Sequence, residues 1–285
     1  MKRIFSFALV ILLVILCSSC NVSFGNYVIY ADAEKYSIGD ISVSTEQIKK
    51  IEINWISGKI NIHRSEDGNL TAFEKEQDLE SEKKMHYYLN GGILIIQYCE
   101  SGYNRHWLSS SEKELDLYLP DGIDVDIDNI SSNITFASDI MLEDVDISNI
   151  SGNIYIKKLT ADSFEFENVS GELFADEIRA DRVDGETVSG DIEIDALYAY
   201  EFNAETVSGD AELGVYDKTD INIDSVSGSI SLIISKNIGL SVDFSSISGD
   251  LKTSLSYVEE NDTYNFGANG ARAEIETVSG NLYVK

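Results

Sequence analysis

A short phrase that reads polar residue, Val or Ile, Ser, Gly returns along the C-terminal half of this 285-residue chain. The glycines of its regular copies are Gly152, Gly171, Gly190, Gly209, Gly228, Gly249 and Gly280. Earlier and less regular copies occupy residues 129–132 and 55–58. The step is 19 residues from Gly152 to Gly228, and then 21 and 31 residues. A fixed period of this length is typical of a solenoid, in which each repeat is one coil and buries its apolar face only against its neighbours.

The apolar residues of one repeat fall into three groups, which predicts the shape of the coil. Phe164 and Phe166 form one group, Val169 and Leu173 form a second in the opposite phase, and Leu159 is a lone third. A strand cannot change its inward face without a bend, so the change of phase after residue 168 predicts a corner. We therefore predict an all-β fold, a roughly triangular parallel β-helix with coils stacked ~4.8 Å apart. By the same pattern we expect Val188, Ile192 and Phe202 to point inward.

The residue at each predicted corner is polar. Stacking places these side chains in one column, where they can hydrogen-bond to one another or cap the bent backbone. The members of this corner ladder are Asn149, Asn168, Thr187, Thr206 and Ser225. A Ser-Gly pair can also hold a nucleophilic serine, but so many copies favour a packing role.

Residues 1–20 have the pattern of an export signal. Lys2 and Arg3 precede an apolar run at 4–16 that is too short to span a bilayer. The run ends in Cys-Ser-Ser-Cys, which resembles a bacterial lipobox, so we expect lipidation of Cys20 and a membrane anchor. An ordinary cleaved signal or a short uncleaved anchor stays open as an alternative.

The remaining chain divides into three parts. Residues 21–40 lack a period and are expected to form a tether, residues 41–122 an N-terminal β region with a first coil, and residues 123–285 the solenoid. Alternating residues on both sides of Asn90-Gly91-Gly92 predict a hairpin in the second part. A strand at 115–119 should end at Pro120, which cannot continue a ladder.

Three phrases resemble a known family. They are VSGDI at 188–192, ELDLYLPDGI at 114–123 and IETVSGNLYVK at 275–285. Together they resemble the bacterial putative-adhesin family of β-strand-repeat domains, and the likeness spans roughly residues 41–285. The resemblance implies a β-solenoid at the cell surface. It supplies no catalytic residue to carry over.

The chain is strongly acidic. Without Lys2 and Arg3 it has 19 basic and 50 acidic residues, a net charge of −31. This charge argues against nucleic acid as a partner and against electrostatic binding to anionic lipid head groups.

Alignment of the repeats places acidic side chains in two outward columns. The first contains Asp126, Asp146, Glu165 and Asp184, and the second contains Asp128, Ser148, Glu167, Glu186, Glu205 and Asp224. One interpretation is a solvated face that opposes sideways aggregation. The other is a weak calcium-binding ladder along the first column, since calcium takes several oxygen ligands. We favour the solvated face, and expect no cofactor.

The sequence favours a non-enzymatic function. No stretch carries the spacing of a metal site, a phosphate-binding loop or a nucleophile elbow. We expect an exported, lipid-anchored envelope protein of adhesin type, whose partner is an envelope protein or a surface glycan. Residues 64–111, rich in aromatic side chains, are the expected site of specificity. The alternatives are a polysaccharide-active enzyme and an envelope-stress component that acts through a membrane partner.

Overall fold

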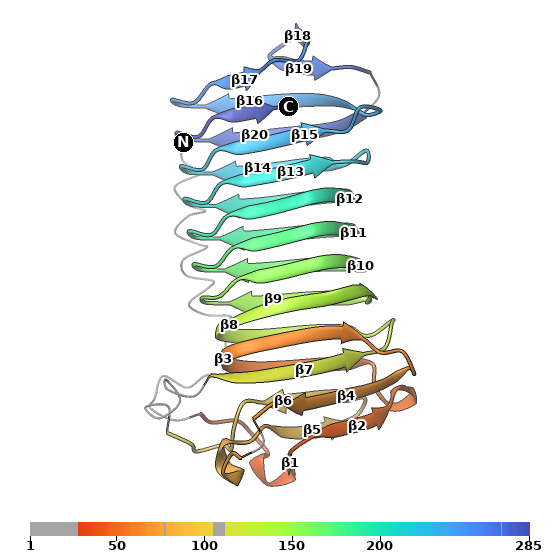
Figure 1. The fold of residues 1–285 in the computed structure, drawn as a ribbon. Helices are drawn as coiled ribbons and strands as arrows, with labels where there is room; N and C mark the ends of the chain where they lie inside the picture. Colours follow the sequence, from red (N-terminus) through yellow and green to blue (C-terminus); the bar gives the residue numbers. More distant parts are fainter. Residues whose placement is uncertain (1–27, 77, 105–111, 269) are drawn as a thin grey trace.

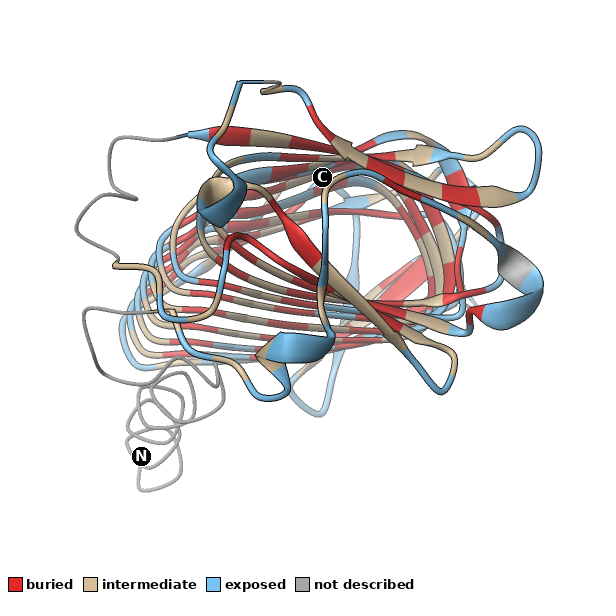
Figure 2. Cartoon of the chain, turned by 90° about the horizontal axis from the view of Figure 1, so that it is seen from below, coloured by how far each residue is buried: buried red, intermediate tan, exposed pale blue. Residues whose placement is uncertain are grey.

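The computed structural model describes residues 28–76, 78–104, 112–268 and 270–285. Over these residues the chain forms one all-β solenoid, with 21 strands joined edge to edge in a single continuous sheet (Figure 1). Seen along the stack, the coils superimpose around one closed core (Figure 2). The predicted fold class is confirmed.

The central coils follow one another in sequence order and pair in parallel. Their strands are β8 (Asp124–Met141), β9 (Asp144–Asn149), β10 (Ile154–Asn168), β11 (Leu173–Thr187) and β12 (Ile192–Thr206). In β10 the pairing with β11 skips residues 157 and 162, where the strand bends and its buried face changes phase. Each central coil therefore buries three groups, which in β10 begin at Ile154, Leu159 and Phe164.

The corner differs from the prediction. Asn168 is 2% exposed and points into the core, whereas Val169 is only half-buried and the chain bends after it. The predicted inward direction of Val188 is likewise wrong, although Ile192 and Phe202 are buried as expected. The phase changes later than predicted because the polar corner side chain must face inward to reach the backbone of its own turn.

Three of the four residues of the repeated phrase have contacts that explain them. The Oγ1 of Thr187 accepts the N–H of Gly190 at 2.9 Å, which caps the turn. The Ser189 hydroxyl donates to the carbonyl of Val169 in the preceding coil at 3.1 Å. A Cβ on Gly190 would lie 1.7 Å from the carbonyl oxygen of Gly171, so only glycine allows the coils to approach. The serine therefore joins neighbouring coils.

The N-terminal end of the stack contains a coil out of sequence order. Strand β3 (Lys50–Arg64) pairs with β8 on one side and with β6 (Ile93–Gln97) and β7 (Lys113–Leu119) on the other. Strand β5 (His86–Asn90) forms the predicted hairpin with β6 through Gly91 and Gly92, both at positive φ. The cap is completed by β1 (Ser37–Ile38), β2 (Ile41–Ser44), β4 (Asn69–Glu74) and the short 3-10 helices η1 (Ala33–Lys35), η2 (Thr45–Gln47) and η3 (Ser81–Lys83).

Part of the expected tether belongs to this cap. The N–H of Val28 donates to the carbonyl of Tyr103 at 2.9 Å, the Tyr30 hydroxyl donates to the carbonyl of Cys99, and β1 pairs with β5. Residues 28–40 are therefore folded. Cys20 and the export signal lie outside the described residues. Among the helices that the structure describes, none has the length and apolar character needed to cross a membrane.

The C-terminal end also breaks sequence order. Its strands are β13 (Ala211–Val215), β14 (Asp220–Ser225), β15 (Ile230–Ile234), β16 (Gly239–Ser246), β17 (Leu251–Thr253), β18 (Val258–Glu260), β19 (Thr263–Phe266), β20 (Gly270–Thr277) and β21 (Leu282–Val284). The last coil, β20 and β21, lies between the coil of β14 and β15 and the coil of β16 and β17. The β18–β19 hairpin lies between β17 and β20 in the sequence and accounts for the 31-residue step from Gly249 to Gly280.

Candidate functional site

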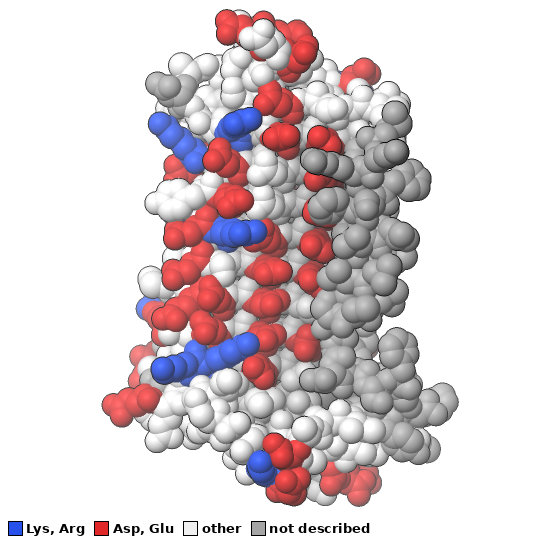
Figure 3. Space-filling view, turned by 180° about the vertical axis from the view of Figure 1, so that it is seen from behind, with Lys and Arg blue, Asp and Glu red and all other residues white. Residues whose placement is uncertain are grey.

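One face of the solenoid carries the acidic columns. They lie on the strand segments that lead into each corner, and they run along the stack (Figure 3). The strand register places the predicted ladder in a single column, with Asp126 beside Asp146, Asp146 beside Glu165, and Glu165 beside Asp184. This first acidic column continues into Asn203 and Asn222.

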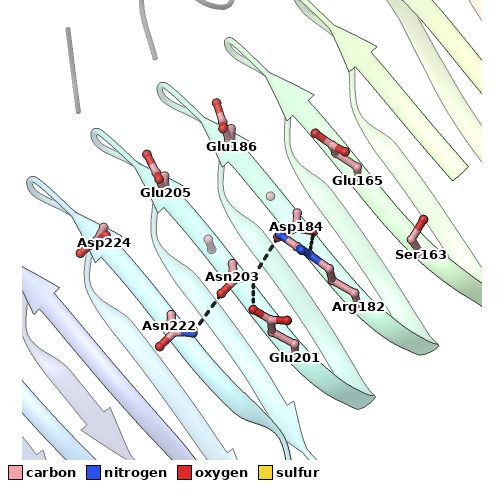
Figure 4. Close-up of a pocket in the computed structure, with 12 residues that line it drawn as sticks. Ser163, Glu165, Arg182, Asp184, Glu186, Glu201, Asn203, Glu205, Asn222 and Asp224 are labelled. Atoms are coloured by element: carbon pink, nitrogen blue, oxygen red, sulfur yellow. Dashed lines mark hydrogen bonds and ion pairs between the residues drawn. The ribbon is translucent and has the colours of Figure 1, made fainter. Parts of the chain in front are cut away.

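The two ends of the ladder in the first acidic column have partners. Lys50 Nζ lies 2.9 Å from Asp126 Oδ2, and the Arg182 guanidinium pairs with Asp184. Asn203 Nδ2 donates to Asp184 Oδ1 at 2.9 Å, and Asn222 Nδ2 donates to Asn203 Oδ1 at 3.0 Å (Figure 4). The change from carboxylates to amides thus replaces repulsion between coils with hydrogen bonds along the column.

The second acidic column is the more perturbed. It contains Asp128, Ser148, Glu167, Glu186, Glu205 and Asp224. Partial burial, followed by repulsion from neighbouring carboxylates, raises the pKa of Asp128 to about 6 and the pKa values of Glu167 and Glu205 to about 7. Glu186 Oε2 is buried without a hydrogen-bond partner. The protein therefore holds Glu167 and Glu205 close to their protonation point at neutral pH.

A shallow hollow of about 710 Å³ lies over the two columns. Figure 4 shows Glu165 and Asp184 on one side of it and Glu186 and Glu205 on the other. Arg182 also borders this hollow. The surface offers carboxylate and amide oxygens to a hydrogen-bond donor. Across the described ranges, no three His, Cys, Asp or Glu side chains are grouped so that they could hold a metal ion.

The region expected to carry specificity is largely a cap. Tyr98 is 1% exposed and packs edge-on against Trp55 with ring centres 4.9 Å apart, so it belongs to the core. Tyr87 and Tyr88 lie in β5, and Trp107 lies outside the described residues. Lys113, which is not among the predicted site residues, has a buried ammonium that pairs with Glu74. A lysine at a position that otherwise reads as the start of a strand gave no signal of burial.

Two solved structures share the fold. A putative adhesin from Bacteroides fragilis is similar with a TM-score of 0.52 and 14% identity, over 88% of this chain and 98% of that chain. A putative lipid binding protein from Parabacteroides distasonis gives a TM-score of 0.51 and 14% identity, over 88% of this chain and 97% of that chain. At this identity the likeness shows the fold alone.

The family comparison covers most of the chain. No curated protein matches this chain. The family model described as Toastrack DUF4097 matches residues 48–285, from the first coil in the sequence to the last residue. Together with the adhesin-like fold, this match confirms the resemblance expected from the repeated phrases. The chain belongs to the Toastrack DUF4097 family.

Proposed function

We propose that this protein is an exported, lipid-anchored and non-enzymatic adhesin-type protein, which displays a binding surface along its solenoid. The observation that carries the proposal is the direction of the stack. The coils extend from a cap that begins at Val28, and seven residues separate Val28 from Cys20 (Figure 1). Seven residues span at most ~25 Å. A lipid on Cys20 would therefore hold the cap at the membrane and project the coils away from it.

This arrangement favours the long faces of the coils as the binding surface. The region at 69–97, which contains β4, β5 and β6, belongs to the cap at the anchored end. A partner in the surroundings of the cell would reach the coils first. Because the acidic columns repel polyanions, the partner is a basic or neutral envelope protein or a neutral surface glycan.

Three features support a role without catalysis. The Ser189 hydroxyl is used in a bond between coils, and the same contact recurs at the other serines of the phrase. The perturbed carboxyl groups lie on an open face. Two solved structures with the same fold are described as a putative adhesin and a putative lipid binding protein. Turnover of a cell-surface polysaccharide by the purified protein would instead support the enzyme alternative.

The anchor is tested by fractionation. We expect Cys20→Ala to release the protein from membranes, whereas Cys17→Ala, three residues earlier, should leave it bound. Mass spectrometry of the wild-type N-terminal peptide should show the added lipid. Unchanged fractionation of the Cys20→Ala variant, with no lipid mass on the wild-type peptide, would reject the anchor.

The binding surface is tested by capture from envelope extracts. The bait is the intact protein, compared with a variant that carries Glu186→Gln and Glu205→Gln on the coil face and one that carries Glu80→Gln and Glu82→Gln on the cap. Loss of a captured partner only with the coil variant supports display along the solenoid. Loss only with the cap variant supports the membrane-partner alternative.

A further inference from the structure

The last coil of the chain lies inside the stack instead of at its end. In the corner column, Thr277 pairs with Ser225 on one side and with Ser246 on the other. The glycine column repeats this order, since a Cβ on Gly280 would lie 1.8 Å from the carbonyl oxygen of Gly228, and a Cβ on Gly249 would lie 1.6 Å from that of Gly280. Residues 270–285 therefore fill a slot one coil thick.

The walls of this slot have the same character as the coil that fills it. Ile275 lies between Ile223 and Phe244, and Leu282 lies between Ile230 and Leu251. The inserted side chains Ala273, Ile275, Leu282 and Val284 are at most 1% exposed. Their burial makes it costly for the coil to leave unless the same side chains are buried again elsewhere. Any copy of this chain offers an identical slot.

The connection to the inserted coil is lightly held. It runs through the β18–β19 hairpin, whose outer strand β18 is exposed at all three residues and pairs only with β19 within the described sheet. Strand β19 joins the stack through four antiparallel positions on β16. Between β19 and β20 the backbone passes Gly267 at a φ of +73°, and it enters the slot at Gly270. Ends of low contact density open more readily than the centre of a fold.

We propose that residues 270–285 are exchanged between two copies of this chain, so that each copy inserts its last coil into the slot of the other. Every contact in the slot is then reproduced between chains. The cost is limited to association and to straightening of the connection, which makes exchange of an identical element a low-cost route to a closed dimer. Because two chains of net charge −29 repel each other, added salt favours the exchanged dimer.

A disulfide across the slot tests the exchange. Asp224 and Glu276 are register partners with outward side chains on β14 and β20. Two separate chains carry Asp224→Cys or Glu276→Cys, each with Cys17 and Cys20 replaced by Ser. They are mixed at high concentration, warmed to just below the melting temperature, cooled and oxidised. A disulfide that joins the two different chains is the expected product, and its yield should rise with salt.

Two controls make the result specific. Glu186→Cys and Glu205→Cys, placed on separate chains, are register partners in the central coils and should give little of the joined product. Both Asp224→Cys and Glu276→Cys in one chain should close an internal disulfide and keep that chain monomeric by size-exclusion chromatography. The proposal is overturned if the slot pair gives no more joined product than the central pair while the internal disulfide closes fully.

Discussion

The ammonium nitrogen of Lys113 lies 4.8 Å from the centre of the Trp55 ring. Trp55 takes the register position of Asn129 in the next coil, so it is the point at which the column of polar corner residues ends. The same ammonium lies 4.1 Å from the centre of the Tyr98 ring and pairs with Glu74. A carboxylate, two aromatic faces and the backbone carbonyls of Lys83 and Tyr98 together replace the water that a side chain only 1% exposed has lost.

This cluster predicts a strong dependence of stability on its pairing. Lys113→Ala leaves the Glu74 carboxylate buried without its ammonium, which should lower the free energy of unfolding by about 3–5 kcal/mol. The double variant Lys113→Met, Glu74→Gln removes both charges and should lose much less. Urea denaturation followed by circular dichroism measures both. Equal losses of unfolding free energy in the two variants would show that stability does not depend on the pairing of the two charges.

The second acidic column predicts that acid stabilises this protein. The folded chain raises the pKa values of Glu167 and Glu205 to about 7, above the ~4.3 of a free glutamate. A raised carboxyl pKa contributes stability that is fully present below the unfolded value and is lost as pH rises through the folded value. The melting temperature should therefore be higher near pH 5 than near pH 8. The double variant Glu167→Gln, Glu205→Gln should have a higher melting temperature at pH 8 and a weaker dependence of the melting temperature on pH. A wild-type melting temperature that falls on acidification would contradict this prediction.

The close approach of the corners predicts a severe effect of one methyl group. Gly190→Ala places a Cβ 1.7 Å from the carbonyl oxygen of Gly171, so two coils must separate and several hydrogen bonds must lengthen. Ser189→Ala removes only the bond to Val169 and should cost about 1 kcal/mol. Thermal melts of both variants test this, and Gly190→Ala should have the lower melting temperature. Similar melting temperatures would mean that the corner yields more easily than its geometry indicates.

The inward and outward faces of a coil predict opposite responses at adjacent positions. Ile192 is 1% exposed, so Ile192→Asp buries an unpaired charge and should disrupt several coils. Glu193, which is exposed, should accept Lys at a cost below about 0.5 kcal/mol. Circular dichroism and the melting temperature report on both variants. Comparable behaviour of the two would be incompatible with the assigned faces.

Calcium and sodium should stabilise the first acidic column equally at matched ionic strength. If Asp146 and Glu165 face water, salt acts only by screening their repulsion. A site that binds calcium would add stability by mass action and raise the melting temperature beyond the effect of sodium. Asp146→Asn with Glu165→Gln should then remove the excess. We expect no excess in the wild-type protein, and a clear one would establish the calcium ladder.

The period of the sequence predicted the coil because each corner has strict local requirements. A glycine such as Gly190 is needed for close approach, and Thr187 is needed to cap it, so the phrase recurs wherever a corner stands. The same period predicts that Asp146 and Glu165 share one column, as the strand register shows. The direction of Asn168 was missed because hydrophobicity alone assigned Val169 to the core.

The order of the terminal coils could not be predicted from these patterns. The phrase around Gly280 is as suited to follow Gly228 as to follow Gly249, because every coil presents the same edge to its neighbour. The 31-residue step before Gly280 indicates an insertion. It does not indicate where the coil that follows the insertion lies in the stack. The raised pKa of Glu167 also depends on how deeply its column is buried and on its neighbours, which a count of charges does not reveal.

The out-of-order coil at the N-terminus sets the order in which the chain can fold. Strand β3 comes early in the chain, yet its sheet neighbours β6, β7 and β8 begin only at residues 93, 113 and 124. One edge of β3 must wait for β6 and β7, and the other edge stays unpaired until β8 has been made. The central strands from β8 to β12 find their parallel partners next to them in sequence, and local contacts form fastest. We therefore expect the parallel stack to form first in its middle and last at its two ends.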